Sequence, residues 1–311
     1  MMDTVASVRW TFRKAAPALA VWALIAAAAL PARAQQEAEE VTIEVVPVAP
    51  GVSMLIGRGG NIGVSAGEDG VFLVDDQYAP LTDEIRAAVA TIDSRPIRFV
   101  LNTHWHGDHT GGNENLGEAG TLIVAHDNVR VRMSSEQFLA AFDETVPPSP
   151  KEALPVVTFN DSVTFHLNGE EIHAFHVPPA HTDGDSVVHF RGADVIHAGD
   201  LFFNGMYPFI DVSSGGDVDG MIAGVERILE LAGEGTRIIP GHGPLGTRAD
   251  LARYRDVLAG VRAAVAAQVA AGKSREETIA AKPTAPFDEA WGGGWMNPDT
   301  FTGIVYDSLT E

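Results

Sequence analysis

Residues that commonly bind metal ions are concentrated in one short stretch of the chain. Three histidines and one aspartate fall within six consecutive positions, as His104, His106, Asp108 and His109. The chain has 11 histidines among 311 residues, so chance does not account for this density. Two imidazoles at positions i and i+2 can converge on one cation where the chain turns after a strand, and the aspartate and last histidine then point toward a second. The pattern therefore predicts a site for divalent metal ions.

The composition restricts what else this chain could do. It contains no cysteine, which excludes disulfides, thiolate nucleophiles and sulfur ligands, so any metal must be held by nitrogen and oxygen. The formal charge is −21, with no local cluster of Lys and Arg to offset it. Such a surface repels phosphate backbones, and we expect no nucleic-acid partner.

The first 34 residues have the three-part organisation of a secretory signal. Arg9, Arg13 and Lys14 precede an apolar run over residues 15–30, which is shorter than the roughly 20 residues needed to span a bilayer. We therefore expect Sec-type export with cleavage after Ala34, a mobile lead-in over residues 35–40, and a periplasmic or secreted protein. No later stretch is long enough to keep the processed chain in a membrane.

The remaining chain, residues 41–311, is expected to form a single α/β domain with a helical C-terminal tail. Apolar and alternating runs predict strands at residues 41–48, 51–56, 61–66, 70–74, 97–101, 121–125, 162–167, 172–177, 186–190, 195–198 and 237–239. Apolar residues at helical spacing predict helices over residues 80–92, 128–142, 221–229 and 247–265. This order favours two packed sheets with helices outside, and strands of both halves ending at a shared edge.

At this point the sequence resembles the metallo-β-lactamase-fold hydrolase superfamily, whose His-x-His-x-Asp-His signature stands at residues 104–109. Three further motifs of that family follow in the expected order. The segment 179–185 contains His181, the segment 198–200 ends on Asp200, and the segment 240–243 contains His242. The resemblance extends from about residue 41 to residue 260. It implies a four-layer αββα sandwich of two mixed β-sheets flanked by helices, with the site at the sheet edges.

The resemblance also implies a division of the metal ligands. His104, His106 and His181 would bind one ion, Asp108, His109 and His242 a second, and Asp200 both. Nitrogen and oxygen donors suit Zn²⁺, so we expect two zinc ions per chain that share a bridging hydroxide as the nucleophile. Asp108 would also act in catalysis by orienting that nucleophile toward the carbonyl group of a small-molecule substrate. The same ligands would accept iron, and an iron-dependent oxidoreductase is the alternative from a different class.

The substrate is less well defined than the reaction. Export favours a β-lactamase-like activity, with a lactonase, an esterase or a thioesterase as alternatives on the same site. In the cysteine-bearing lactamases of this superfamily, a Cys stands at the position of Asp200 and a substrate-binding Lys three residues later, where this chain has Phe203. Arg58 could supply the missing cation, or it could be a solvated turn residue. A non-catalytic metal-binding protein is the third class considered.

Other residues carry weaker signals. Asp75 either supports the metal-binding loop or only ends a strand, and Asn102 and Thr103 have the same two interpretations. The segment 291–295, with a tryptophan at each end, is interpreted as a helix-packing tail rather than a flap or an oligomer contact. The sequence leaves the natural substrate and the oligomeric state open. We assign no chemistry to the remaining histidines, His126, His166, His173, His176, His189 and His197.

Overall fold

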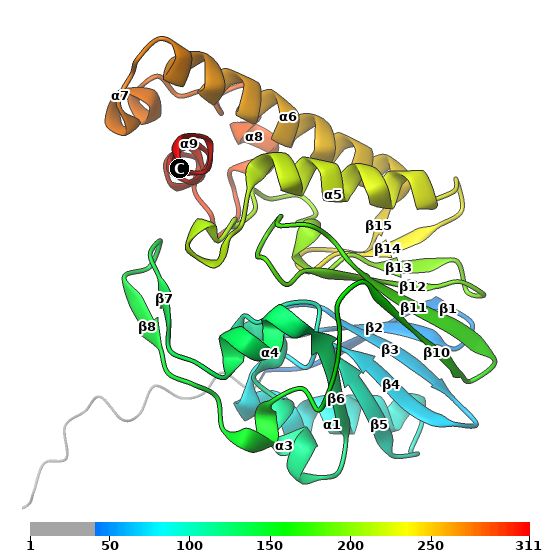
Figure 1. Ribbon diagram of the computed structural model, residues 1–311. Helices are drawn as coiled ribbons and strands as arrows, with labels where there is room; N and C mark the ends of the chain where they lie inside the picture. The colour runs from blue at the N-terminus through cyan, green and yellow to red at the C-terminus, as the bar shows by residue number, and fades with distance from the viewer. Residues whose placement is uncertain (1–40) are drawn as a thin grey trace, which may run out of the picture. The chain divides into compact units, whose positions relative to one another are not determined.

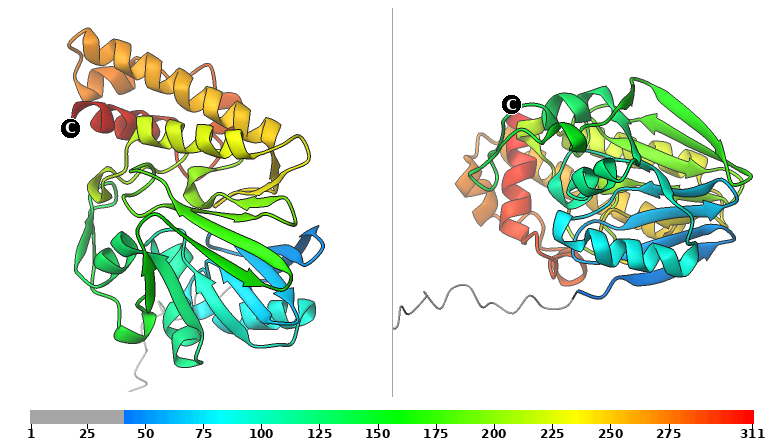
Figure 2. Two further views of the ribbon diagram at one scale, coloured as in Figure 1. Left: turned by 45° about the vertical axis from the view of Figure 1, so that its right-hand side comes forward. Right: turned by 90° about the horizontal axis from the view of Figure 1, so that it is seen from below.

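The computed structural model describes residues 41–311. The predicted signal sequence, its cleavage point and the lead-in at residues 35–40 lie outside the described residues. Two large mixed sheets pack face to face and helices cover the outer face of each, as Figures 1 and 2 show. The predicted αββα fold class is confirmed. No helix within residues 41–311 is long and apolar enough to cross a membrane.

The first sheet has seven strands in the order β1-β2-β3-β4-β5-β6-β9. Its first four strands form an antiparallel meander, and β5, β6 and β9 then add in parallel to β4. The strands are β1 (Glu44–Ala49), β2 (Val52–Ile56), β3 (Ile62–Gly67), β4 (Gly70–Val74), β5 (Ile97–Leu101), β6 (Leu122–His126) and β9 (Val157–Phe159). On its outer face lie α1 (Thr82–Ile92), α3 (Asn113–Glu118) and α4 (Asp127–Met133), whereas the short α2 (Gly107–Thr110) follows β5 at the edge of the sheet.

The second sheet has six strands in the order β10-β11-β12-β13-β14-β15, and only β13 and β14 pair in parallel. The strands are β10 (Ser162–Leu167), β11 (Glu170–His176), β12 (Ser186–Phe190), β13 (Val195–His197), β14 (Arg237–Ile239) and β15 (Gly246–Thr247). The C-terminal half supplies the helices over this sheet, namely α5 (Val218–Leu231), α6 (Arg248–Ala270), α7 (Arg275–Ala280), α8 (Asp288–Trp291) and α9 (Pro298–Thr310).

Side-chain alternation along the central strands explains the layers. In β4, Phe72 and Val74 point into the core between the two sheets, whereas Val71 and Leu73 point toward α1. Because both faces are covered, every residue of β4 is buried. Helix α6 begins with a capping box, in which Thr247 and Asp250 each bond the other's backbone.

The helix predicted over residues 128–142 is wrong in its second half. Helix α4 ends at Met133, where the hydroxyls of Ser134 and Ser135 donate to the carbonyl of Val131 and compete with continued helical bonding. The chain then forms a two-stranded hairpin of β7 (Gln137–Leu139) and β8 (Glu144–Val146), which pairs with neither large sheet. Figure 1 shows this hairpin standing apart from both sheets, on the side where the C-terminal helix also ends.

Candidate metal centre

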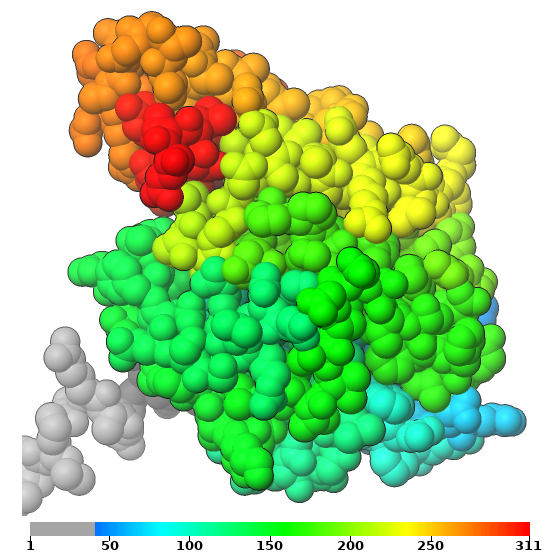
Figure 3. All heavy atoms as spheres, viewed as in Figure 1, coloured from blue at the N-terminus to red at the C-terminus, as the bar shows by residue number. Residues whose placement is uncertain are grey.

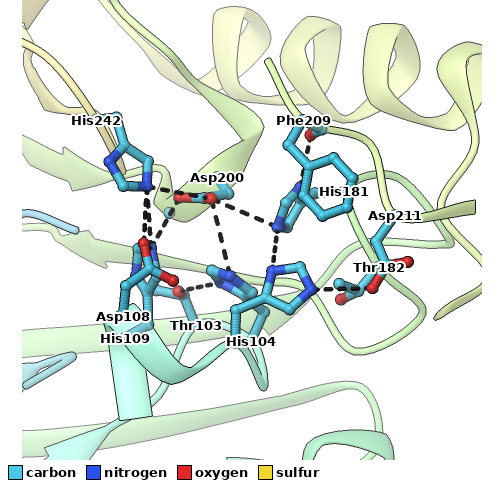
Figure 4. Close-up of polar contacts among 12 residues, drawn as sticks. Thr103, His104, Asp108, His109, His181, Thr182, Asp200, Phe209, Asp211 and His242 are labelled. Atoms are coloured by element: carbon cyan, nitrogen blue, oxygen red, sulfur yellow. Dashed lines mark hydrogen bonds and ion pairs between the residues drawn. The ribbon is translucent and has the colours of Figure 1, made fainter. Parts of the chain in front are cut away.

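The predicted ligands all follow the ends of strands, at the edge shared by the two sheets. His104 and His106 lie in the loop after β5, and Asp108 and His109 lie in the short helix α2. His181 comes from the loop between β11 and β12, Asp200 from a 3-10 turn after β13, and His242 from the loop after β14. The carboxyl ends of β5, β13 and β14 therefore meet at one place, as parallel strands in each sheet allow. Figure 4 shows the resulting arrangement.

The structure brings all seven predicted side chains together. His104, His106 and His181, the first cluster, have ligand atoms within 4.8 Å of one another, and so do Asp108, His109 and His242, the second cluster. His106 Nδ1 lies 2.9 Å from His181 Nε2, and His242 Nε2 lies 3.3 Å from Asp108 Oδ2. The residues of each cluster are those that the family resemblance assigns to one ion.

Asp200 lies between the two clusters. One of its carboxylate oxygens is 3.4 Å from His181 Nε2 and 3.5 Å from His242 Nε2, and the other is 3.1 Å from His109 Nε2. Asp200 also forms a third possible ligand group with His104 and His109. A single carboxylate is thus within reach of both clusters, as a shared ligand must be.

The outer nitrogens of four imidazoles are held by other groups. Thr103 Oγ1 lies 3.0 Å from His104 Nδ1, and Asp75 Oδ2 lies 2.8 Å from His109 Nδ1. The outer nitrogen of His106 is 2.9 Å from Asp211 Oδ2, and that of His181 is 2.8 Å from the backbone oxygen of Phe209. An acceptor at the outer nitrogen fixes the ring's orientation and favours a lone pair on the inner nitrogen, which is what a metal ligand needs.

Asp75, in the loop after β4, contacts both ends of the segment that carries the first motif. It is fully buried and has a left-handed φ of 64°, which is uncommon for a non-glycine residue. Its carboxylate accepts hydrogen bonds from the backbone nitrogen and the hydroxyl of Thr103, at 2.7 and 2.8 Å, in addition to its contact with His109. Of the two interpretations of Asp75, the structure therefore shows the supporting one. Asn102 also supports the loop, because its amide donates to the backbone oxygen of His109.

Two carboxylates that hold the histidines of the first cluster in place were not predicted from the sequence. Asp211 is buried and bonds His106, but it belongs to no motif and lies about 30 residues from His181, so the sequence carried no signal for it. Asp185 accepts hydrogen bonds from the backbone nitrogens of His181 and Thr182, at 2.7 and 2.8 Å. Its position three residues after Thr182 in a short loop was the available signal, because Asp commonly bonds nearby backbone groups.

Glycines let the loops approach the clusters closely. A Cβ atom on Gly60 would overlap the ring of His109, and one on Gly241 would overlap the carboxylate of Asp200. The loop 57–61 is fixed at this position because Asn61 Nδ2 donates to the carbonyls of Pro240 and Gly243, both at 2.9 Å. The loop therefore holds Arg58 at the wall of the site.

The buried carboxylates require positive charge. Burial opposes ionisation of Asp108, but the charge of His109 and the bond to His242 hold its pKa at about 2. Burial likewise opposes protonation of His242, yet Asp200 and Asp108 raise its pKa to about 9. At the first cluster, burial lowers the pKa of His181 to about 4 and leaves a neutral imidazole.

One buried atom in the centre, His104 Nε2, has no hydrogen-bond partner among the described residues, and Asp200 Oδ1 has only its ion-pair contact with His109 Nε2. Orphaned polar atoms are costly in a protein interior, and a divalent cation would satisfy both of these. Neutral imidazoles in the first cluster, carboxylates that need positive charge and unsatisfied inner atoms together fit a metal ion.

A cavity of about 760 Å³ opens onto this centre. His106, Asp108, Asp200 and His242 are among its lining residues, and Arg58 contributes to its wall.

The two tryptophans of the segment 291–295 have different positions. The ring of Trp291 lies 5.8 Å from that of Tyr254 in α6, as a packing tail predicts, whereas Trp295 is 54% exposed and lines the cavity.

Comparisons with known proteins agree with this geometry. The chain is 32% identical over 165 residues to the hydroxyacylglutathione hydrolase of Nitrosococcus oceani, a match covering 52% of this chain and 55% of that protein. It is 23% identical over 190 residues to the metallo-beta-lactamase type 2 of Bacillus cereus, covering 61% of this chain and 69% of that one. The match thus spans about half the length of these hydroxyacylglutathione hydrolases.

Among solved structures, a metallo-beta-lactamase from Pontibacter korlensis shares the fold with a TM-score of 0.58 at 20% identity, covering 70% of this chain and 99% of that one. The family model described as the metallo-beta-lactamase superfamily matches residues 55–242, which is more than half of the chain and includes all seven clustered side chains. The chain belongs to the metallo-beta-lactamase superfamily.

Proposed function

We propose that this protein is an exported hydrolase that binds two zinc ions and cleaves a carbonyl compound, with an acyl thioester or ester as the first substrate class. The observation that carries the proposal is the convergence of seven histidine and aspartate side chains into two clusters that share Asp200. The inner nitrogens of His104, His106, His109 and His181 are oriented toward the centre, and the donor set of nitrogen and oxygen suits zinc.

Each cluster would hold one ion, and Asp200 would contact both. Zinc ions bound here would make a water molecule acidic enough to attack near neutral pH and would polarise the substrate carbonyl. The remaining chemistry falls to residues of this chain. The side chain of Asp108 is 23% exposed and lines the cavity, so one carboxylate oxygen can accept a hydrogen bond from the attacking water and fix its direction. The buried side chains of Phe209 and Trp105, which also line the cavity, limit access of other water.

Thioester or ester cleavage is favoured over lactam cleavage by the residue at position 203. Phe203 is fully buried, and its ring lies over that of His242 at 5.1 Å, so this position offers no cation for the carboxylate of a lactam. The similarity to hydroxyacylglutathione hydrolases supports the same preference. A β-lactamase-like activity is the second candidate, because Arg58 lies in the wall of the cavity and could bind such a carboxylate.

The proposal is tested by hydrolysis of a panel that contains a thioester, an ester, a lactone and a lactam, using zinc-loaded protein that begins at residue 35. Asp108→Asn should lower turnover by about two to four orders of magnitude, the usual contribution of a positioned proton acceptor. Asp256→Asn, at an aspartate whose side chain is 68% exposed on α6, is the matched control and should retain full activity. Wild-type turnover in Asp108→Asn, or no cleavage of any substrate by protein shown to contain two zinc ions, would refute the proposal.

Export is tested separately. The protein produced from the full-length gene should be recovered from the periplasm or the medium with Gln35 as its first residue, which N-terminal sequencing measures. Recovery of the uncleaved chain from the cytoplasm would contradict this part of the proposal.

A further inference from the structure

An aromatic surface extends from the first cluster to the mouth of the cavity. Phe209 lies against the ring of His106, with centroids 5.7 Å apart, and Phe142 lies 4.9 Å from Phe209. Trp295 completes the group at 6.3 Å from both phenylalanines. All three rings line the cavity, and we call them the aromatic wall.

The aromatic wall combines segments that are far apart in the sequence. Phe142 lies in the turn of the β7–β8 hairpin, Phe209 in the loop before α5, and Trp295 between α8 and α9. Figures 1 and 2 show the hairpin and the C-terminal helix on the same side of the described part of the chain. Figure 3 shows the yellow-green segment before α5 between them. Trp295 lies beyond residue 242, where the family match ends.

The wall is fixed to the first cluster by hydrogen bonds. The backbone nitrogen of Ala140 in the hairpin donates to Ser213 Oγ at 3.3 Å, and Ser213 Oγ donates to Asp211 Oδ1 at 2.6 Å. Asp211 in turn holds His106, and the carbonyl of Phe209 holds His181. Phe142 and Phe209 are therefore positioned relative to the reacting centre, as a substrate subsite requires, and Trp295 packs against both.

The exposure of the wall indicates that it is built for a ligand. Phe142 is 45% exposed and Trp295 is 54% exposed, although both could be covered by an apolar group lying in the cavity. Only Phe209, at 5% exposure, is already buried by the protein itself. Large apolar side chains that converge on a cavity with a few polar groups at its base are the usual composition of small-molecule sites.

We infer that the aromatic wall is a specificity subsite that binds an aromatic ring or a branched apolar chain carried on one side of the scissile bond. This inference rests on the proposed hydrolase function and narrows its substrate class to thioesters or esters with a bulky apolar group next to the carbonyl or on the leaving group. Each methylene group that is transferred from water to an apolar site raises the binding constant roughly fourfold. A phenyl group in contact with the wall should therefore raise kcat/KM by about tenfold or more.

The experiment compares two pairs of substrates with the zinc-loaded enzyme. The acyl pair is the acetyl and phenylacetyl thioesters of N-acetylcysteamine, and the leaving-group pair is the acetyl thioesters of ethanethiol and 2-phenylethanethiol. The measured quantity is the ratio of kcat/KM between the phenyl compound and its small partner. We expect this ratio to be about ten or more in at least one pair, and to fall severalfold in Phe142→Ala and in Trp295→Ala.

The matched control is Phe138→Ala. Phe138 is on the same hairpin and is similarly exposed, at 53%, but it does not line the cavity. It should leave the ratio at its wild-type value. Ratios near one in both pairs, or equal effects of the Phe142 and Phe138 replacements, would overturn the inference even if the enzyme hydrolyses all four substrates.

A binding measurement separates this inference from the proposed function. Thioethers in which a CH₂ group replaces the carbonyl of the acyl pair and of the leaving-group pair cannot be hydrolysed, and calorimetry gives their affinities. Tighter binding of a phenyl thioether, lost in Trp295→Ala, supports the subsite even if no substrate is cleaved. Equal affinities within both pairs together with active hydrolysis would leave the hydrolase proposal standing and refute the subsite.

Discussion

Replacement of Asp75 by asparagine should weaken metal binding at the second cluster and affect the first cluster much less. The Asp75 carboxylate accepts three hydrogen bonds, one of them from His109 Nδ1. An amide can satisfy the rigid backbone nitrogen of Thr103 only if its oxygen takes the position of Oδ1. Its NH₂ group then faces His109 Nδ1, which must become an acceptor, and the ring proton moves to Nε2, the nitrogen that points toward the second cluster.

The cost of this change follows from the contacts. Loss of an outer partner that fixes a ligating histidine typically lowers metal affinity by 10- to 100-fold, which is about 1.4–2.7 kcal/mol. The opposite amide orientation would place NH₂ against the backbone N–H of Thr103, and such a buried donor without an acceptor costs roughly 1–3 kcal/mol. Neither orientation avoids a penalty of this size.

The assay is a zinc titration against a chromophoric chelator, with thermal unfolding as a second measurement. Wild-type protein should bind two equivalents, and Asp75→Asn should bind one with near wild-type affinity and the second about 10- to 100-fold more weakly. Asp76→Asn is the matched control. Asp76 is also buried, its Oδ2 has no partner among the described residues, and an amide oxygen can still accept from the backbone nitrogen of Gly112. Two tight equivalents in Asp75→Asn would refute the assigned role.

Three further predictions follow from the same structure. Asp211→Asn should weaken zinc binding at the first cluster by about 10-fold or more and leave the second ion tightly bound, the converse of the result for Asp75, as the same titration measures. Arg58→Gln should raise KM by roughly tenfold for a substrate that carries a carboxylate, because one charge-assisted hydrogen bond contributes about 1.5–3 kcal/mol. The KM of the corresponding methyl ester should change little. Equal effects on both substrates would show that Arg58 does not bind the carboxylate. Burial lowers the pKa of the stacked rings of His126 and His176, so the folded state favours their neutral forms. The unfolded chain takes up protons first as the pH falls below about 6.5, and the folded protein then loses stability. His126→Asn should therefore lose less thermal stability than the wild type between about pH 7.5 and 5.5.

The parts of the fold that the sequence predicted are those in which one strong pattern determines the structure. The buried strand β4 is an apolar run between turn residues, and α6 begins at a capping box that is visible in four residues. The candidate ligands were predictable for the same reason, because imidazole and carboxylate groups clustered directly after strands have few other uses. Their division into two clusters was implied by the family resemblance, and in the structure the motifs follow strands that run in parallel within each sheet.

The parts that could not be predicted depend on contacts between distant segments. Phe138 and Phe142 have the spacing of a helical face, and only the bonds of Ser134 and Ser135 back to α4 show that the helix has already ended. Asp211 acquires its role through a contact with His106, 105 residues earlier in the chain. Trp295 resembles any aromatic residue of a helical tail until the fold places it beside Phe142.

The two kinds of residue are subject to different physical requirements. Metal ligands must be placed to within about half an ångström, and the candidate ligands here follow the ends of paired strands with their outer nitrogens fixed by buried groups such as Asp75. An apolar subsite needs only area and shape, so it can be supplied by a hairpin outside both sheets and by Trp295 near the C-terminus. Changes in the hairpin should therefore alter which acyl or leaving group is preferred without removing the metal ions. Replacing residues 137–146 by a short Gly-Ser linker tests this directly, and loss of bound zinc in that variant would show that the hairpin also maintains the metal centre, through Ser213 and Asp211.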